Sequence, residues 1–264
     1  MTLPQLMVAP NGATKGKSDH PAVPVTIDEI VETAVACEKA GADGIHAHVR
    51  DGSGAHVLDP GLYQELLAEL QRSTPRLYVQ ITTEAVGRYS AAEQAELVYA
   101  VKPSAVSVAL REMTRAGEAE VRRFYHWCEE ASVEVQHILY DADDVSRLAV
   151  LRAQKVVPDR PLMVLYVLGR YASGQVAVES DLGPFLARQS AELGALDWAV
   201  CAFGGNETRC LQHASTLGGK LRVGFENNLW NADGSRAADN ADRVREVFAA
   251  THARQAVGGA AIRS

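Results

Sequence analysis

Two patterns of apolar residues alternate along the whole chain. The first is a short run of about four to eight residues, rich in Val, Ile and Leu and apolar on both faces. Such runs are typical of parallel strands that are covered on both sides. We predict eight of them, at residues 5–10, 44–50, 76–83, 105–111, 134–140, 162–169, 197–204 and 221–227.

The second pattern is a longer stretch in which apolar residues recur at the spacing of a helix. The first of these begins with Thr26 and Glu29, which resemble a capping box, and ends at Gly41, a typical C-cap residue. We predict helices at residues 26–42, 60–72, 90–101, 117–131, 144–154, 182–193, 207–218 and 239–255.

The order of these elements favours one fold class. Eight alternations of strand and helix over 264 residues are what an α/β protein of the (β/α)8 TIM-barrel type requires. No Pro-, Gly- or Ser-rich linker interrupts them, so we predict a single TIM-barrel domain over residues 1–264. A doubly wound sheet is the alternative, but no G-x-G-x-x-G follows the first predicted strand, which disfavours a dinucleotide site.

Composition excludes several classes of partner. The net charge of −7 argues against nucleic acid or a membrane surface as the main partner. No run of about 18 apolar residues and no leader pattern is present. The four cysteines are far apart and form no C-x-x-C pair, which favours a reduced compartment. We expect a soluble, cytoplasmic protein.

The stretch G-I-H-A-H-V-R-D at residues 44–51 places unusual polar groups on a buried strand. Alternation along a strand puts His46, His48 and Arg50 on one face. Burying two imidazoles and a guanidinium is costly unless a metal ion or an anion satisfies them. Packing of the histidines against backbone carbonyls is the simpler alternative.

A carboxylate at the last predicted strand strengthens the metal interpretation. In R-V-G-F-E-N, Arg222 and Glu226 share a face, and barrel closure brings this strand near the histidines. Two imidazoles and one carboxylate leave a coordination position open, as in catalytic zinc sites. We predict that His46, His48 and Glu226 bind zinc, although iron, cobalt or manganese could use the same donors.

Other polar residues follow the predicted strands and are candidates for substrate binding or proton transfer, because barrel active sites lie at the carboxyl ends of the strands. Arg50 and Arg222 suit an anionic substrate but could instead pair with neighbouring carboxylates. Gly204 and Gly205 precede a helix and could bind a phosphate. The remaining candidates are Asn11, Thr82, Thr83, Glu84, Arg111 and Glu112, with Tyr166, Arg170 and Tyr171 as residues that could set specificity.

Four segments resemble the β-keto acid cleavage enzymes, also called the 3-keto-5-aminohexanoate cleavage family. They are A-P-N-G-A at 9–13, H-P-A-V-P-V-T at 20–26, H-A-H-V-R-D-G-S-G at 46–54 and R-V-G-F-E-N-N at 222–228. The resemblance implies a TIM barrel, a homo-oligomer (dimer or tetramer), zinc on His46, His48 and Glu226, and acetyl-CoA as co-substrate. The implied reaction converts a β-keto acid and acetyl-CoA into acetoacetate and a new acyl-CoA, with Arg222 stabilising developing negative charge.

The chain departs from the family pattern at residues that transfer protons. Asn227 stands where the family commonly has the aspartate that acts as base, and Thr14 where it commonly has a glutamate. We therefore predict a relocated base, Glu112 or Glu84, with Asn227 as a further catalytic candidate. Arg111 and Glu112 also replace the small residues that bind the substrate carboxylate in the family.

Three other functions remain open. The chain could be a CoA-independent, metal-dependent lyase or hydrolase of a related keto acid, or a non-catalytic protein that binds a metabolite. An amidohydrolase also uses an H-x-H pair, but that pair ends the first strand and further histidines follow on strands five and six. Here only His137 on the fifth predicted strand supports that function.

Overall fold

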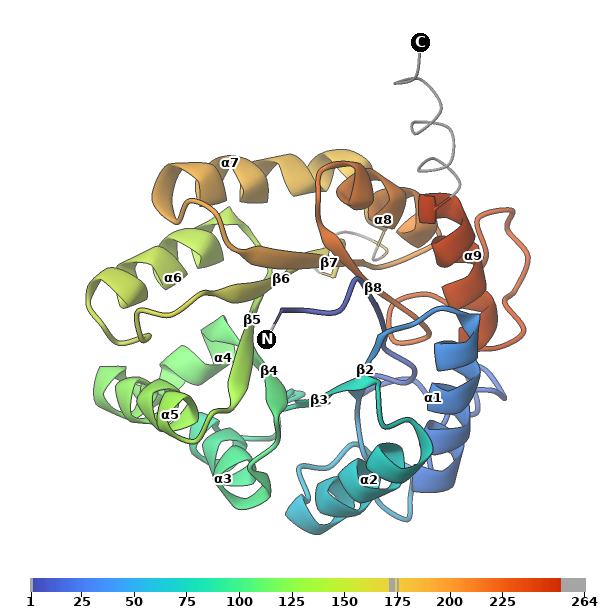
Figure 1. Cartoon of the computed structure of the whole chain (residues 1–264), viewed down its shortest axis with the longest axis horizontal. Coiled ribbons are helices and arrows are strands. Elements are labelled where there is room, and N and C mark those ends of the chain that lie inside the picture. The colour runs from blue at the N-terminus through green and yellow to red at the C-terminus, as the bar shows by residue number, and fades with distance from the viewer. Residues whose placement is uncertain (1, 171–173, 175, 253–264) are drawn as a thin grey trace.

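The computed structural model describes residues 2–170, 174 and 176–252. Within them, eight parallel strands pair in sequence order, and the last pairs with the first to close a barrel (Figure 1). The TIM-barrel prediction is therefore confirmed. The strands are β1 (Leu6–Val8), β2 (Gly44–Ala47), β3 (Tyr78–Thr82), β4 (Ala105–Ala109), β5 (Glu134–Leu139), β6 (Met163–Leu168), β7 (Asp197–Ala202) and β8 (Lys220–Val223).

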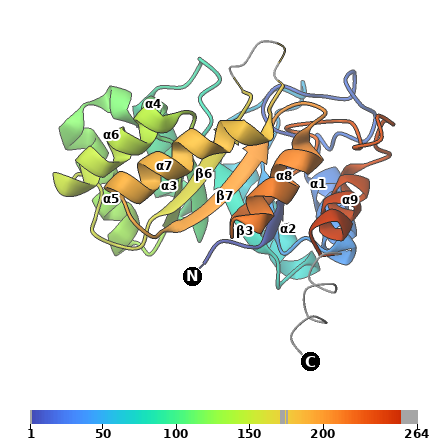
Figure 2. The same ribbon diagram turned by 90° about the horizontal axis from the view of Figure 1, so that it is seen from above.

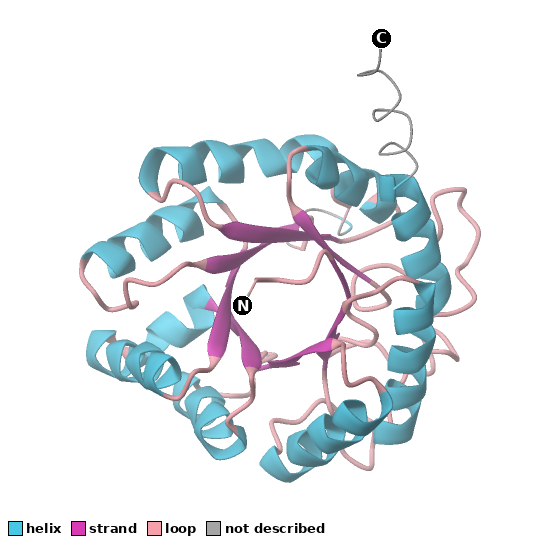
Figure 3. Cartoon of the chain, in the orientation of Figure 1, coloured by secondary structure: helices cyan, strands magenta, loops and turns pink. Residues whose placement is uncertain are grey.

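Helices form a ring around the barrel (Figure 3) and run alongside its strands in the side view (Figure 2). The predicted capping box of Thr26 and Glu29 and the left-handed C-cap at Gly41 are both present in the first helix. The part of the last predicted helix at residues 253–255 lies outside the described residues. The helices are α1 (Ile27–Ala40), α2 (Pro60–Ser73), α3 (Ala91–Val101), α4 (Leu110–Met113), α5 (Glu118–Glu130), α6 (Ala142–Ala153), α7 (Leu182–Glu192), α8 (Glu207–Thr216) and α9 (Asn240–His252).

All eight strands end one to four residues earlier than predicted, and three of these ends change where candidate site residues lie. β2 ends at Ala47 and β8 at Val223, so His48 and Glu226 lie on the segments that follow the strands. β4 ends at Ala109, and Arg111 lies on the short helix α4 instead of on the strand. These segments direct polar side chains at the barrel mouth, together with His46, Thr82 and Arg222 on the strands themselves.

Two hydrophobic cores follow from the alternation of side chains along the strands. The larger lies between the barrel and its helices and includes Val8, Ile45 and Ile81. A smaller core lies inside the barrel, mainly on β4–β7, and includes Ile138, Leu165 and other apolar residues. No helix among the described residues is long and apolar enough to cross a membrane.

Candidate active site

A cavity opens at the carboxyl ends of the strands, where TIM barrels carry their active sites. Its walls include six of the residues named as candidates from the sequence, which are His46, Thr82, Glu84, Arg170, Arg222 and Glu226. The other lining residues are Ala13, Thr14, Ala109, Ile138, Tyr140, Val167 and Phe203. Residues from both ends of the chain therefore meet at this cavity.

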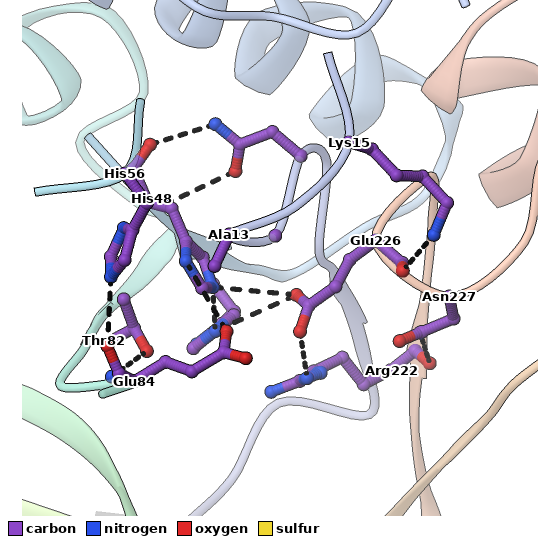
Figure 4. Close-up of polar contacts among 12 residues, drawn as sticks. Ala13, Lys15, His48, His56, Thr82, Glu84, Arg222, Glu226 and Asn227 are labelled. Carbon is purple, nitrogen blue, oxygen red and sulfur yellow. Dashed lines mark hydrogen bonds and ion pairs between the residues drawn. The ribbon is translucent and has the colours of Figure 1, made fainter. Parts of the chain in front are cut away.

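His46, His48 and Glu226 bring their ligand atoms to one point. The two Nε2 atoms lie 3.1 Å apart, and each lies 3.8 Å from Oε2 of Glu226. Figure 4 shows His48 and Glu226 turned toward each other, with Arg222 beside the carboxylate. Among the described residues, this buried Oε2 atom has no hydrogen-bond donor. The three side chains therefore form a candidate metal site with an unsatisfied carboxylate oxygen directed at both imidazoles.

A chain of side-chain amides fixes the tautomer of His46. The Val164 carbonyl can only accept, so the Gln136 amide nitrogen donates to it at 3.2 Å. Gln136 Oε1 then accepts from Gln80 Nε2 at 3.1 Å, and Gln80 Oε1 accepts from His46 Nδ1 at 2.9 Å. Because the proton is held on Nδ1, the Nε2 lone pair faces the candidate site.

Burial and nearby charges put the three donors in the protonation states that a metal requires. Burial lowers the pKa of His46 to about 3, and burial, followed by the neighbouring His46, holds the pKa of His48 well below its usual value. Burial opposes ionisation of Glu226, but Arg222 and the weaker contributions of other cationic groups near the carboxylate together outweigh burial, so the pKa of Glu226 lies below its usual value. The histidines are therefore neutral and the glutamate ionised at neutral pH.

A tight turn after β8 holds Glu226 over the barrel. Gly224 has a φ of +141°, and its amide donates to the Glu207 carboxylate at 3.2 Å. The next amide, of Phe225, donates to Asn240 Oδ1 at 2.9 Å. At the far end of the turn, Glu226 accepts from Arg222 Nη2 at 2.8 Å. The direction of the carboxylate thus depends on contacts to α8 and α9.

Glu84, one of the two predicted bases, lies at the cavity. Its carboxylate is 3.9 Å from His48 Nδ1 and 3.8 Å from Arg170 Nη2. Burial, followed by the charge of Glu226, raises the pKa of Glu84 to about 7. A carboxyl group of this kind can exchange protons near neutral pH.

Glu112 and Arg111 do not reach the cavity. Glu112 accepts a hydrogen bond from the Ala85 amide at 3.1 Å and lines a separate depression beside α3 and α5. Arg111 is bound to Asp144 at 2.6 Å and to Asp141 at 2.8 Å. The placement of both residues is at odds with their predicted roles in proton transfer and substrate binding.

Asn11 and Arg50 hold the backbone at the rim. The Asn11 amide donates to the carbonyl groups of His48 at 2.8 Å and Pro24 at 3.1 Å. Arg50 donates to the carbonyl groups of Asn11, Ala13, Lys15 and Gly54 at 2.9–3.4 Å, and also to that of Gly12. Neither side chain lines the cavity. Their predicted contact with substrate is therefore not supported by their placement, because the Asn11 amide and both terminal nitrogens of Arg50 donate to the protein's own carbonyls.

Asn227 is directed into the protein beneath the mouth. Its amide donates to Glu207 Oε1 at 3.3 Å and to the Arg222 carbonyl at 3.4 Å. Glu207 is itself fully buried and paired with Arg243 at 2.8 Å. The side chain of Asn227 does not line the cavity, which disfavours a direct catalytic role.

The remaining candidates from the sequence also include residues that line the cavity and residues that do not. Thr82 lines the cavity, where its hydroxyl accepts from the Glu84 amide at 3.0 Å, whereas Thr83 donates to the Ser107 carbonyl at 3.1 Å. Tyr166 faces α7 and donates to Gln189 Oε1 at 2.8 Å. Tyr171 lies outside the described residues.

Sequence reasoning missed four residues that shape the site. Gln80 lies two residues before Thr82, so both side chains point to the same, inward face of β3. A glutamine on the inward face of a largely apolar strand could have indicated a role in the site. Lys15 donates to the Glu226 carbonyl at 2.6 Å, and Phe203 lines the cavity after β7. Glu207 holds the β8 turn from the start of α8, where the sequence had suggested only a phosphate-binding loop.

Solved structures with the same fold include the binary complex of ObcA with oxaloacetate (TM-score 0.66, 15% identity, 90% of this chain and 67% of that chain). A type I 3-dehydroquinate dehydratase from Clostridium difficile matches with a TM-score of 0.63 at 14% identity, over 97% of this chain and 94% of the other. These likenesses concern the fold alone.

Similar sequences share one family. The chain is 26% identical to the 3,5-dioxohexanoate:acetyl-CoA acetone transferase of Paraburkholderia graminis, over 90% of this chain and 86% of the relative. It is also 26% identical to the 3-keto-5-aminohexanoate cleavage enzyme of Fusobacterium nucleatum (89% and 86%) and to the 3-oxoadipate:acetyl-CoA acetyltransferase of Cupriavidus necator (94% and 89%). The family model described as beta-keto acid cleavage enzyme matches residues 5–258. The chain therefore belongs to the β-keto acid cleavage enzyme family.

Proposed function

We propose that this protein is a zinc-dependent β-keto acid cleavage enzyme that uses acetyl-CoA. In this reaction, R–CO–CH2–COO⁻ and acetyl-CoA yield R–CO–CoA and acetoacetate. The acetyl group of the thioester thus ends on the two-carbon fragment of the keto acid, and CoA ends on the acyl fragment. The proposal is supported by family membership over residues 5–258 and by relatives named as acetyl-CoA-dependent transferases.

The observation that carries the proposal is the donor set at the barrel mouth. His46, His48 and Glu226 would hold the metal ion, because their ligand atoms converge and Glu226 Oε2 has no other partner among the described residues. A zinc ion bound there would act as a Lewis acid on the keto acid and increase the acidity of its α-carbon. Other divalent metals remain candidates for the same donors.

Arg222 would bind negative charge inside the cavity. It is buried, and only one of its terminal nitrogens is engaged by Glu226. Within the described part of the chain, its Nε and Nη1 groups have no hydrogen-bond acceptor. Such unpaired donors can hold a substrate carboxylate or a developing oxyanion at little reorganisation cost.

Glu84 would act as the general base that removes a proton from the α-carbon of the keto acid. It is the candidate base that lines the cavity, and it lies beside His48 and Arg170. Asn227 has no basic group, and Glu112 is bound to the backbone outside the cavity. A base contributed by the segment after β3 would therefore replace the carboxylate that the resemblance places at position 227.

The first experiment is an assay of zinc-loaded protein with β-keto acids of different side chains, with and without acetyl-CoA. We expect acetoacetate and the new acyl-CoA in equal amounts, and loss of both when a chelator removes the metal. Product formation that does not depend on added metal would contradict the proposed donor set.

A CoA-independent lyase or hydrolase is the second candidate, and Asn227 and Thr14 favour it, because the chain lacks two carboxylates that the resemblance would assign to proton transfer. The same assay distinguishes acetyl-CoA-dependent cleavage from CoA-independent activity. Turnover that is unaffected by omission of acetyl-CoA would select the second candidate. Binding of keto acid without any turnover would select a non-catalytic metabolite-binding protein.

A further inference from the structure

The inner wall of the barrel has two chemically different halves. The half formed by β8, β2 and β3 carries Arg222, Glu226, His46, Gln80 and Thr82. The opposite half, formed by β4–β7, presents an apolar wall to the cavity. We call this second surface the apolar wall; it consists of Ala109, Ile138, Val167 and Phe203, which all belong to the smaller core cluster.

Each charged side chain that lines the cavity lies near a side chain of opposite charge. Arg222 is 2.8 Å from Glu226, and Arg170 is 3.8 Å from Glu84. The Arg170 guanidinium also lies over the Phe203 ring, 5.1 Å from its centroid. Among the described lining residues, each cation thus has a carboxylate partner, and the apolar wall itself carries no charged side chain.

Family membership does not determine which distal group the substrate carries. The relatives' names specify a 5-amino group in one case, a second carboxylate in 3-oxoadipate and a second ketone in 3,5-dioxohexanoate. A further relative, matched over 27% of this chain, is named for 3-dehydrocarnitine. The distal group must therefore be inferred from this chain's own cavity.

We infer that the substrate is a β-keto acid whose distal chain is aliphatic and uncharged, and that this chain packs on the apolar wall. The inference rests on the proposed function. A keto acid held at its reactive end by the polar half faces the apolar wall on β4–β7 across the cavity. A charge carried at its distal end would lose hydration against this wall, whose own side chains offer it no partner, while the nearby Arg170 already faces Glu84.

A matched panel tests the inference directly. 3-Oxohexanoate, 3-oxoadipate and 5-amino-3-oxohexanoate share six carbons and differ in distal charge. With zinc-loaded protein and acetyl-CoA, we expect kcat/KM for 3-oxohexanoate to exceed both others by about tenfold or more, the least that an unsuited group costs in an apolar pocket. A preference for either charged substrate would overturn the inference.

Substitutions in the apolar wall test whether the distal chain of the substrate packs there. Ile138→Ala shortens the apolar wall and should raise the ratio of kcat/KM for 3-oxooctanoate over 3-oxohexanoate by about tenfold. Ile30→Ala is the matched control, because Ile30 on α1 is equally large and buried but lies away from the cavity. In Ile30→Ala, the ratio of the two kcat/KM values should stay at the wild-type value. Equal ratios in both variants would overturn the assignment of the wall, and Val167→Ala provides an independent repeat if the first variant folds poorly.

A binding measurement separates this inference from the proposed function. Thermal stabilisation of zinc-loaded protein by the same keto acids, without acetyl-CoA, reports preference for the distal group in the absence of turnover. Stronger stabilisation by 3-oxohexanoate supports the inference even if acetyl-CoA chemistry fails. Stronger stabilisation by a charged keto acid, or none by any of them, overturns it.

Discussion

Replacing Gln80 by leucine tests how the interior of the barrel prepares His46 for a metal. The substitution keeps the volume of the side chain but removes the acceptor that holds a proton on His46 Nδ1. It also leaves Gln136 Oε1 buried without its donor. Two separate effects should follow, one on metal affinity and one on stability.

Both magnitudes can be estimated from these contacts. Loss of a hydrogen bond to a metal-binding histidine typically costs about 10–100-fold in affinity, which corresponds to about 1.4–2.8 kcal/mol. The unsatisfied Gln136 oxygen should reduce the free energy of unfolding by about 1–3 kcal/mol. The double variant Gln80→Leu/Gln136→Leu removes that orphan group, so it should regain part of the stability but none of the zinc affinity.

Zinc affinity is measured by competition with a chromogenic chelator, and stability by urea unfolding of the metal-free protein. Gln94→Leu is the control, because Gln94 is a buried glutamine on α3, outside the site. It should leave zinc affinity unchanged. The reasoning is refuted if Gln80→Leu binds zinc as tightly as the wild type, or if the control weakens binding equally.

Three further predictions concern proton transfer and the support of the β8 turn. Glu84→Gln should lower kcat/KM by about 100-fold or more, whereas Glu112→Gln should change it little; equal losses would remove Glu84 as the base. Arg243→Met leaves the fully buried Glu207 unpaired and should reduce stability by about 3–5 kcal/mol in urea unfolding. A wild-type unfolding curve would contradict this estimate. Asn227→Asp places a carboxylate against Glu207 and should lower the melting temperature without raising kcat; an increase in kcat would show that a base can act from position 227.

The fold and the candidate metal donors could be predicted from the sequence because both depend on local patterns. Alternation along each strand gave the inward face, and parallel strands bring their carboxyl ends to one rim. His46, His48 and Glu226 needed only these two rules to be placed together. That His48 and Glu226 lie beyond the ends of β2 and β8 did not change the result.

The candidates that lie outside the cavity are held there by partners distant in the sequence. Arg111 leaves the strand pattern because Asp141 and Asp144, about thirty residues later, bind its guanidinium beside α6. Asn11 and Arg50 were expected to face a ligand, but loop carbonyls take up their donors. A one-dimensional pattern shows that a polar group is buried, and does not show which partner it finds.

The donors of the candidate metal site also have a consequence for how the chain folds. His46 lies on β2, His48 and Glu226 lie on the segments that follow β2 and β8, and these two strands flank β1 in the closed ring. The fit there is tight, since a Cβ atom on Gly12 would lie 2.5 Å from Cγ of Glu226. All three donors come together only after the last strand has docked on the first, so a cation held by them would bind only chains that have completed the ring. Its binding energy would then add to the folding equilibrium and rise with the logarithm of the free metal concentration. Such a cation would link the first and last quarters of the sequence without a covalent bond.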